Sequence, residues 1–125
     1  MSEITGILID VLNMRAPRPY TISPNNLDEY YTALGCDVFD VTTRKIGRQF
    51  YDIYCDDEGL LKCNPILSAV DSDGHPALVG NLFVCKHDAE GNTIGLSVHE
   101  MQEIISNTRT VCDIRGSYKV LVCDI

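Results

Sequence analysis

Three consecutive acids stand between two cysteines in the segment YDIYCDDEGLLKCNP, residues 51–65. Carboxylates such as those of Asp56, Asp57 and Glu58 bind divalent metals or act as general acids and bases. Two further segments, DSDG and DAEG, have the same order of acid, any residue, acid and glycine, and all three lie between apolar segments. Glycine and aspartate at these positions are typical of tight turns, and neither DDEGLLKCNPIL nor DSDGHP has the ligand spacing of a calcium loop. The spacing therefore predicts turns and no metal site.

The other residues that could do chemistry form no recognised catalytic pattern. The sequence contains no G-x-S-x-G, no Walker phosphate loop, no G-x-G-x-x-G and no H-E-x-x-H. The histidines at 75, 87 and 99 do not share a helix face, and we expect them at the surface. Cys85 and His87 lack a third group that would orient them as nucleophile and base. We predict no catalytic residues and no cofactor; a metal-dependent hydrolase that uses residues 56–58 is an alternative.

Positive charge gathers at two places in an otherwise acidic chain, which has 10 basic and 18 acidic residues. One place is the segment TTRKIGRQF, and the other is NTRTVCDIRG. Arginines, together with an aromatic ring, can hold a phosphate-bearing ligand. The alternative is that these bases offset nearby acids or protect the edge of a sheet. The predicted ligand-binding residues are Arg44, Arg48, Arg109 and Arg115 for phosphates, and Tyr54 or Asn92 for a base or ribose.

Composition and charge limit the class of protein. The chain has 125 residues, of which 45% are hydrophobic and 22% charged, and its net charge is −8. These values indicate a single globular domain, 1–125, that does not bind nucleic acid directly, while a basic partner protein remains possible. No apolar run is long enough to span a membrane, and the N-terminal residues lack a basic signal region, so we expect the cytoplasm. In that compartment the six cysteines are expected to be reduced, and most to be buried.

The expected elements must place these residues on a sheet. Residues 3–12 predict a strand, and the three prolines of residues 15–24 predict a loop. Asn26 and Gly35 bound one predicted helix, and a capping box of Ser97 and Glu100 begins a second. Further strands are expected over 36–46, 48–56, 77–87 and 117–125. The sequence therefore predicts an α+β domain: a mostly antiparallel sheet of about five or six strands, with two short helices packed on one face.

Three segments, ALGCDVFDV, YDIYCDDEGLLKCNPILSAVDSDG and ALVGNLFVCKHDAEGN, together resemble a family of small proteins catalogued as domain of unknown function 3846. The similarity covers about residues 28–105, and Cys36 stands where the family has a second glycine. Residues 15–24 and 108–125 fall outside the family pattern. The matching positions are Gly35, the run Asp57-Glu58-Gly59-Leu60, Asn64, Ala69, Asp71, Asp73, Gly74 and Gly80.

The resemblance implies an α+β fold and an origin in a phage or a bacterial mobile element, and it implies no catalytic residues. By analogy with accessory proteins of that origin, we expect an anti-defence protein in the cytoplasm of a bacterial host. Its role would be to sequester a small anionic, nucleotide-like signal, and a homo-oligomer is compatible with that role. The alternative is an acidic inhibitor that mimics nucleic acid and binds a basic host protein. No membrane association is expected.

Overall fold

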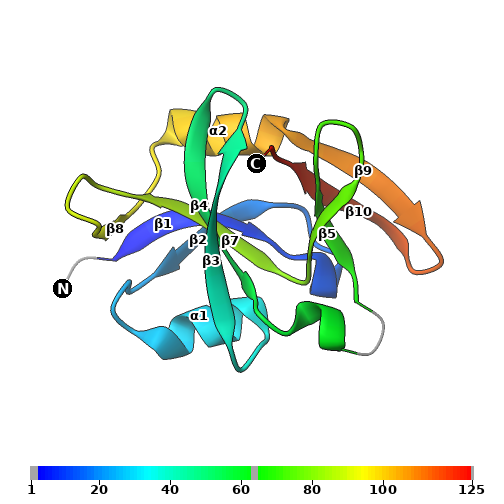
Figure 1. Cartoon of the computed structure of the whole chain (residues 1–125), viewed down its shortest axis with the longest axis horizontal. Helices are drawn as coiled ribbons and strands as arrows, with labels where there is room; N and C mark the ends of the chain where they lie inside the picture. The colour runs from blue at the N-terminus through cyan, green and yellow to red at the C-terminus, as the bar shows by residue number, and fades with distance from the viewer. Residues whose placement is uncertain (1–2, 63–64, 125) are drawn as a thin grey trace.

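Two β-sheets and two α-helices make up the computed structural model, which describes residues 3–62 and 65–124 (Figure 1). Among these residues there are also two short 3-10 helices, η1 and η2. The elements of the larger sheet are β1 (Ile4–Ile9), β2 (Arg18–Ile22), β3 (Phe39–Ile46), β4 (Gln49–Asp56), β7 (Leu82–His87) and β8 (Thr93–Ile94). Those of the smaller sheet are β5 (Leu67–Val70), β6 (Pro76–Val79), β9 (Thr108–Asp113) and β10 (Gly116–Val122). The helices are α1 (Leu27–Leu34), α2 (Val98–Ser106), η1 (Val11–Asn13) and η2 (Gly59–Leu61).

The larger sheet has the strand order β2-β1-β7-β4-β3, with β8 paired to β7, and the smaller has β6-β5-β10-β9. Strands β10 and β5 are parallel, and the other pairs between described strands are antiparallel. The backbones of Lys45 on β3 and Asp124 after β10 exchange two hydrogen bonds, of 2.9 and 2.8 Å. This bridge joins an edge of the larger sheet to the end of β10.

Strand β7 contributes side chains to the cores on both faces of the larger sheet. Its first four residues, LFVC, are all apolar. Alternate side chains of a strand point to opposite faces of the sheet. Leu82 and Val84 belong to the core between the two sheets, whereas Phe83 and Cys85 belong to a second core under α1. A continuous apolar run is therefore required here, as in any strand that is covered on both sides.

The two helices cover opposite faces of the larger sheet (Figure 1). Tyr30 and Leu34 of α1 pack in the second core, and Ile104 of α2 packs in the first. The prediction that both helices lie on one face is therefore wrong. Asn26 caps α1 by accepting the N–H of Asp28 at 3.2 Å, and the predicted capping box of α2 is present. No helix among the described residues has the length and apolar character that crossing a bilayer requires.

The predicted α+β class, with two helices and a mostly antiparallel sheet, is confirmed. Two segments differ from their predictions. Residues 15–24 were expected to form a loop, yet Arg18–Ile22 form β2, whose place at the sheet edge tolerates Pro19. Residues 77–87 were expected to form one strand, yet they divide into β6 and β7 in different sheets, because Gly80 takes a φ of 78° between them. The residue Ile125 of the expected last strand lies outside the described residues.

Asn81 fixes the place where β1, β7 and α1 come together. Its side-chain Nδ2 donates to Asp10 Oδ1 at 2.8 Å and to the carbonyl oxygen of Ala33 at 3.1 Å. Its Oδ1 accepts the backbone N–H of Leu12 at 3.0 Å. Asn81 and Asp10 are both buried, so these hydrogen bonds form without competition from water. One amide group thus links the end of β1, the start of β7 and the last turn of α1.

Asp10 is the charged member of this junction. It also accepts hydrogen bonds from Asn13 Nδ2 and from an Arg18 Nη, each at 2.9 Å. Burial by itself raises the pKa of Asp10, but the hydrogen bonds from Arg18, Asn81 and Asn13 outweigh it and hold the pKa below its ordinary value. A carboxyl with a lowered pKa contributes stability that is present at neutral pH and is lost as the pH falls through that pKa.

Replacing Asn81 with alanine tests the junction. The change leaves Asp10, the Leu12 N–H and the Ala33 carbonyl short of a partner, and each unsatisfied buried group costs about 1–3 kcal/mol. We therefore expect the free energy of unfolding, measured by urea denaturation, to fall by about 3 kcal/mol. The matched control is Gln102→Ala, which removes an exposed amide and changes stability by less than about 0.5 kcal/mol. Equal stability of Asn81→Ala and the unchanged protein would contradict the role of the junction.

Candidate functional site

The acidic segment that follows β4 is a turn, as the sequence predicts, but it is not the tip of a hairpin. Asp56 Oδ1 accepts the N–H of Glu58 at 2.9 Å, and Asp57 donates its N–H to the carbonyl of Val38 at 3.0 Å. The chain then enters η2 and continues to β5, which belongs to the other sheet. The turn therefore carries the chain from one sheet to the other, and its acids stand beside the gap between β4 and β6.

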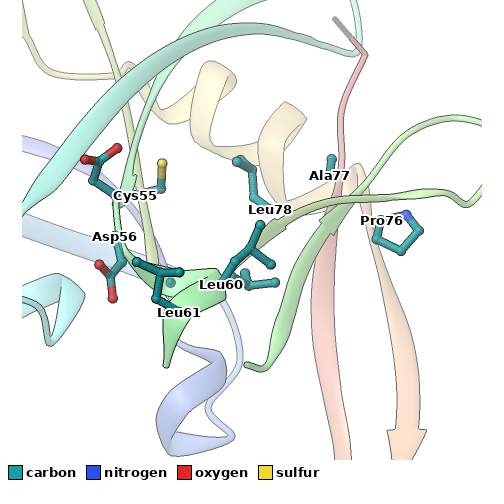
Figure 2. A pocket seen from close by; sticks show the side chains of 10 residues that line it. Cys55, Asp56, Leu60, Leu61, Pro76, Ala77 and Leu78 are labelled. Atoms are coloured by element: carbon teal, nitrogen blue, oxygen red, sulfur yellow. The ribbon is translucent and has the colours of Figure 1, made fainter. Parts of the chain in front are cut away.

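An apolar groove, here called the η2 groove, lies between the end of β4, η2 and β6. It encloses about 320 Å³. Its lining residues are Cys55, Asp56, Asp57, Gly59, Leu60, Leu61, Pro76, Ala77, Leu78 and Val79. Figure 2 shows Leu60, Leu61 and Leu78 in the space between Cys55 and Asp56 on one side and Pro76 and Ala77 on the other. The groove is thus built from segments about twenty residues apart in the sequence.

Leu60 and Leu61 are the unusual residues of the η2 groove, because they are 78% and 83% exposed. They follow Gly59 in η2, whose backbone has no room for a side chain: a Cβ there would lie 2.8 Å from Val79 Cγ2. Exposed apolar side chains are ordinary when single, but a pair beside a groove is typical of an interaction site. Sequence analysis missed them, although two consecutive leucines after a glycine turn were a visible signal.

The charge of the η2 groove is negative. Asp56 and Asp57 are its charged lining residues, and Glu58 is exposed beside them. Lys62 does not reverse this charge, because its Nζ is bound to Asp56 Oδ2 at 2.7 Å. The hydrogen bond that Lys62 donates to Asp56 raises the pKa of Lys62, so its ammonium group stays charged at neutral pH. An apolar groove with an acidic rim suits a ligand with apolar groups and positive charge.

Cys55 lines the groove but is not a nucleophile. Burial, together with the nearby carboxylates of Asp40, Asp57 and Asp56, raises the pKa of its thiol to about 11. A thiol is reactive only as the thiolate, which is scarce at neutral pH when the pKa is this high. Cys55 therefore contributes packing rather than chemistry.

A second acidic turn, between β5 and β6, was also considered as a metal site. Side-chain ligand atoms of Asp71, Asp73 and His75 lie within 4.8 Å of one another. However, Asp71 Oδ1 already accepts the N–H groups of Asp73 and His75, each at 2.9 Å, which is the bonding of a turn. The guanidinium of Arg109 also lies against this turn, 3.1 Å from where a Cβ of Gly74 would be. Asp71 therefore stabilises the turn, which connects an antiparallel pair of strands as predicted.

The six predicted ligand-binding residues are distributed over the molecule. Arg44 lies on β3, where its Nε donates to Thr42 Oγ1 at 3.3 Å, and Arg48 is exposed in the turn between β3 and β4. Tyr54 is buried against α1 and its hydroxyl bonds to Thr93 Oγ1 at 3.1 Å. It is therefore part of the second core and does not offer a ring to a ligand.

The other three residues lie on different loops and strands. Asn92 donates its backbone N–H and its Nδ2 to Asp88, at 2.9 and 3.3 Å, and so closes the turn between β7 and β8. Arg115 pairs with Asp113 in the turn between β9 and β10. Arg109 lies on β9 beside the β5–β6 turn.

Arg44 and Arg109 approach one region, the end of β10. Burial raises the pKa of Cys123, and the positive charge of Arg44 is near enough to oppose that rise. Arg109 contacts the β5–β6 turn, and Ser72 of that turn donates its N–H to Asp124.

Several positions that match the family pattern meet around a single ion pair. Lys62 Nζ bonds to Asp56 and also donates to the carbonyl of Gly35 at 3.3 Å. A Cβ on Gly80 would lie 3.9 Å from the Cβ of Asp56. Together with the buried Gly59, these glycines bring α1, η2 and β6 close to the acidic turn. The pattern position Asn64 lies outside the described residues.

The comparisons with known proteins confirm the family, but the matching region is longer than the predicted 28–105 and includes residues 15–24, which were expected to fall outside the family pattern. A family model described as a domain of unknown function (DUF3846) matches residues 4–109. No curated protein and no solved structure matches the chain.

The thiols give a direct test of the groove geometry. We expect iodoacetamide, at mildly alkaline pH, to modify the exposed Cys112 at least about 100-fold faster than the buried Cys55, because little of Cys55 is thiolate. Peptide mass spectrometry after timed quenching measures both rates. In urea the modification rates of Cys112 and Cys55 should converge. This control shows that the difference comes from the fold and not from the neighbouring residues in the sequence. Rapid modification of Cys55 in the folded protein would show that the groove is open to its base.

Proposed function

The chain belongs to the family of domain of unknown function 3846, whose description assigns no activity. We therefore propose a function from the geometry of the site. The protein binds a basic, apolar segment of a partner protein in the η2 groove. The observation that carries this proposal is the exposure of Leu60 and Leu61, 78% and 83%, beside an acidic turn. Such a protein acts as an acidic inhibitor or adaptor rather than as an enzyme.

The energy available from this groove fits a specific interaction. Burying one leucine side chain contributes about 1.5–3 kcal/mol, so two contribute roughly 3–6 kcal/mol before the cost of association. A micromolar dissociation constant corresponds to about 8 kcal/mol, so the leucines supply a large part of such an affinity. The acids of the rim and the net charge of −8 add attraction for a basic partner and increase the rate of encounter.

The same charge argues against a second copy of the chain as the occupant. Two molecules that each carry a net charge of −8 repel one another, and the rim of each η2 groove is acidic. The expected phage or mobile-element origin is part of this proposal, and under it the partner is a basic protein in the cytoplasm of the bacterial host. A homo-oligomer formed through another surface is compatible with it.

The other two hypotheses have less support from the geometry. The small anionic ligand remains a prediction, but its six residues lie on separate turns and strands, and Tyr54 is buried. A hydrolase based on residues 56–58 remains an alternative, but Asp56 is held by Lys62 and by the N–H of Glu58. In both cases several of the groups that were expected to act on a ligand, among them Arg115 and Asp56, already have protein partners.

A short peptide of alternating leucine and lysine is a suitable probe of the η2 groove. We expect it to bind with chemical-shift changes at Gly59, Leu60 and Leu78, and the double variant Leu60→Ser, Leu61→Ser should weaken binding at least about tenfold. Because both leucines are exposed, the variant should fold normally. The matched control is Ile114→Ser, since Ile114 is fully exposed in the β9–β10 turn.

Two further peptides separate the apolar and electrostatic contributions. A serine–lysine peptide should bind more weakly than the leucine–lysine peptide, and a leucine–glutamate peptide should not bind. Added salt should weaken binding of the leucine–lysine peptide, because screening at physiological ionic strength acts over about 8 Å. Equal binding of the serine–lysine peptide, or no loss of affinity in the double leucine variant, would contradict the proposal.

A further inference from the structure

Two neighbouring cations on β7 are each held by a buried carboxylate. His87 Nδ1 is 2.7 Å from Asp52 Oδ2 on β4, and Lys86 Nζ is 2.6 Å from Glu100 Oε2 on α2. Asp52 is 6% exposed and Glu100 8%. Successive residues of a strand point to opposite faces, so the two pairs lie on the two sides of β7. This arrangement takes no part in the η2 groove.

The two pairs lie where strands β4 and β7 separate. Strands β4 and β7 are hydrogen-bonded from Cys55–Leu82 to Asp52–Cys85, and their pairing ends there. Beyond this point lies a pocket of about 350 Å³, here called the split pocket. Its lining residues are Thr43, Gln49, Phe50, Asp52, Lys86, His87 and Ile94. Its size lies within the range of about 300–1,000 Å³ that is usual for small-molecule sites.

The carboxylates of the two pairs have no free capacity for a ligand. Asp52 Oδ1 accepts the hydroxyl of Thr43 at 2.9 Å, and its Oδ2 is used by His87. Glu100 Oε1 accepts the N–H of Ser97 at 2.8 Å, and its Oε2 is used by Lys86. All four carboxylate oxygens therefore have a donor, and their negative charge is compensated.

The cations, in contrast, keep unused donors. An ammonium group has three N–H donors, and one of those of Lys86 goes to Glu100. The imidazole of His87 is bound through Nδ1, so Nε2 is left for another partner. The hydrogen bond and the charge of Asp52 raise the pKa of His87, which favours the form in which Nε2 also carries a proton. The N–H at Nε2 of His87 is thus left as a donor in the split pocket, where it suits an anion.

An aromatic ring completes the pocket. Phe50, on β4, is 60% exposed, although the neighbouring Tyr51 is buried. An exposed aromatic side chain beside oriented polar groups is typical of a binding site, because it offers a large apolar face at low cost in conformational entropy. Phe50 therefore provides a surface on which a flat ring can stack.

In the Asp52–His87 pair the carboxylate is buried, whereas the side chain of His87 is 53% exposed. The pair provides a fixed orientation for the exposed imidazole, as carboxylate partners do at functional histidines.

We propose that the split pocket binds a small aromatic anion, with His87 holding the anionic group and Phe50 stacking on the ring. A nucleoside monophosphate has this chemistry and size. The site is independent of the η2 groove, since the two lie at opposite ends of β4.

Titration with adenosine 5′-monophosphate, followed by NMR of the histidine and phenylalanine rings, tests the site. We expect shifts of the His87 and Phe50 ring signals, with a dissociation constant below the millimolar range. His87→Gln and Phe50→Ala should each weaken binding about tenfold or more. If His87→Gln folds poorly, Phe50→Ala still tests the site, because Phe50 is exposed and its replacement should not disturb the fold. His99→Gln and Ile114→Ala, which change exposed residues elsewhere, should bind as the unchanged protein does.

Titrations with adenosine and with inorganic phosphate separate the two halves of the ligand. Both should bind more weakly than the monophosphate, because each lacks one of the two contacts. Equal affinity for inorganic phosphate, no binding of the monophosphate at millimolar concentration, or unchanged affinity in Phe50→Ala would each overturn the proposal. If the protein binds adenosine 5′-monophosphate but not the leucine–lysine peptide, the η2 groove proposal is contradicted and the split pocket proposal stands.

Discussion

The buried hydrogen bonds that Asn81 makes with Asp10 and Ala33 hold together the end of β1, the start of β7 and α1, next to the η2 groove. Asn81 stands directly after Gly80, where the chain leaves the smaller sheet at β6 and enters the larger sheet at β7. Its amide also holds the last turn of α1 through the carbonyl of Ala33. If this junction shifts, β6 moves relative to β4 and the η2 groove changes shape. The position of a groove made from two sheets is therefore set by one polar side chain in the core rather than by apolar packing alone.

The elements that the sequence predicts well are those with strong local signals. Asn26 and Gly35 bound α1, and Ser97 with Glu100 begins α2, because capping is decided by residues within one turn. The misassigned segments depend on distant partners. Arg18–Ile22 become a strand only because β1 offers an edge, and residues 77–87 look like one strand until the positive φ of Gly80 separates them. Strand β9 was likewise not predicted, since its exposed Arg109 and Thr110 hide the alternation.

The candidate sites were less accessible to sequence analysis than the fold. The acids at 56–58 were correctly interpreted as a turn, but the neighbouring leucines could not be known to be exposed without the position of β6. Asp52 and His87 are 35 residues apart, and their contact depends on the pairing of β4 with β7. The arginines were grouped by their nearness in sequence, and the sheet then placed Arg109 and Arg115 toward opposite ends of the β9–β10 hairpin. Charge clusters in a sequence become surface patches only when the strands that carry them run side by side.

The parallel pairing of β10 with β5 has a consequence for how the protein is made. Strand β10 lies between β5 and β9, and its residues Val120 and Leu121 fill the core between the sheets. A ribosome therefore releases β5 and β6 long before the strand that stabilises them has been synthesised. Until residues 116–122 emerge, the hairpin of β5 and β6 has no neighbour, and the apolar face that the larger sheet turns toward it is uncovered. Pairing between strands this far apart in the sequence forms late, and apolar surface that waits for such a partner is prone to aggregation.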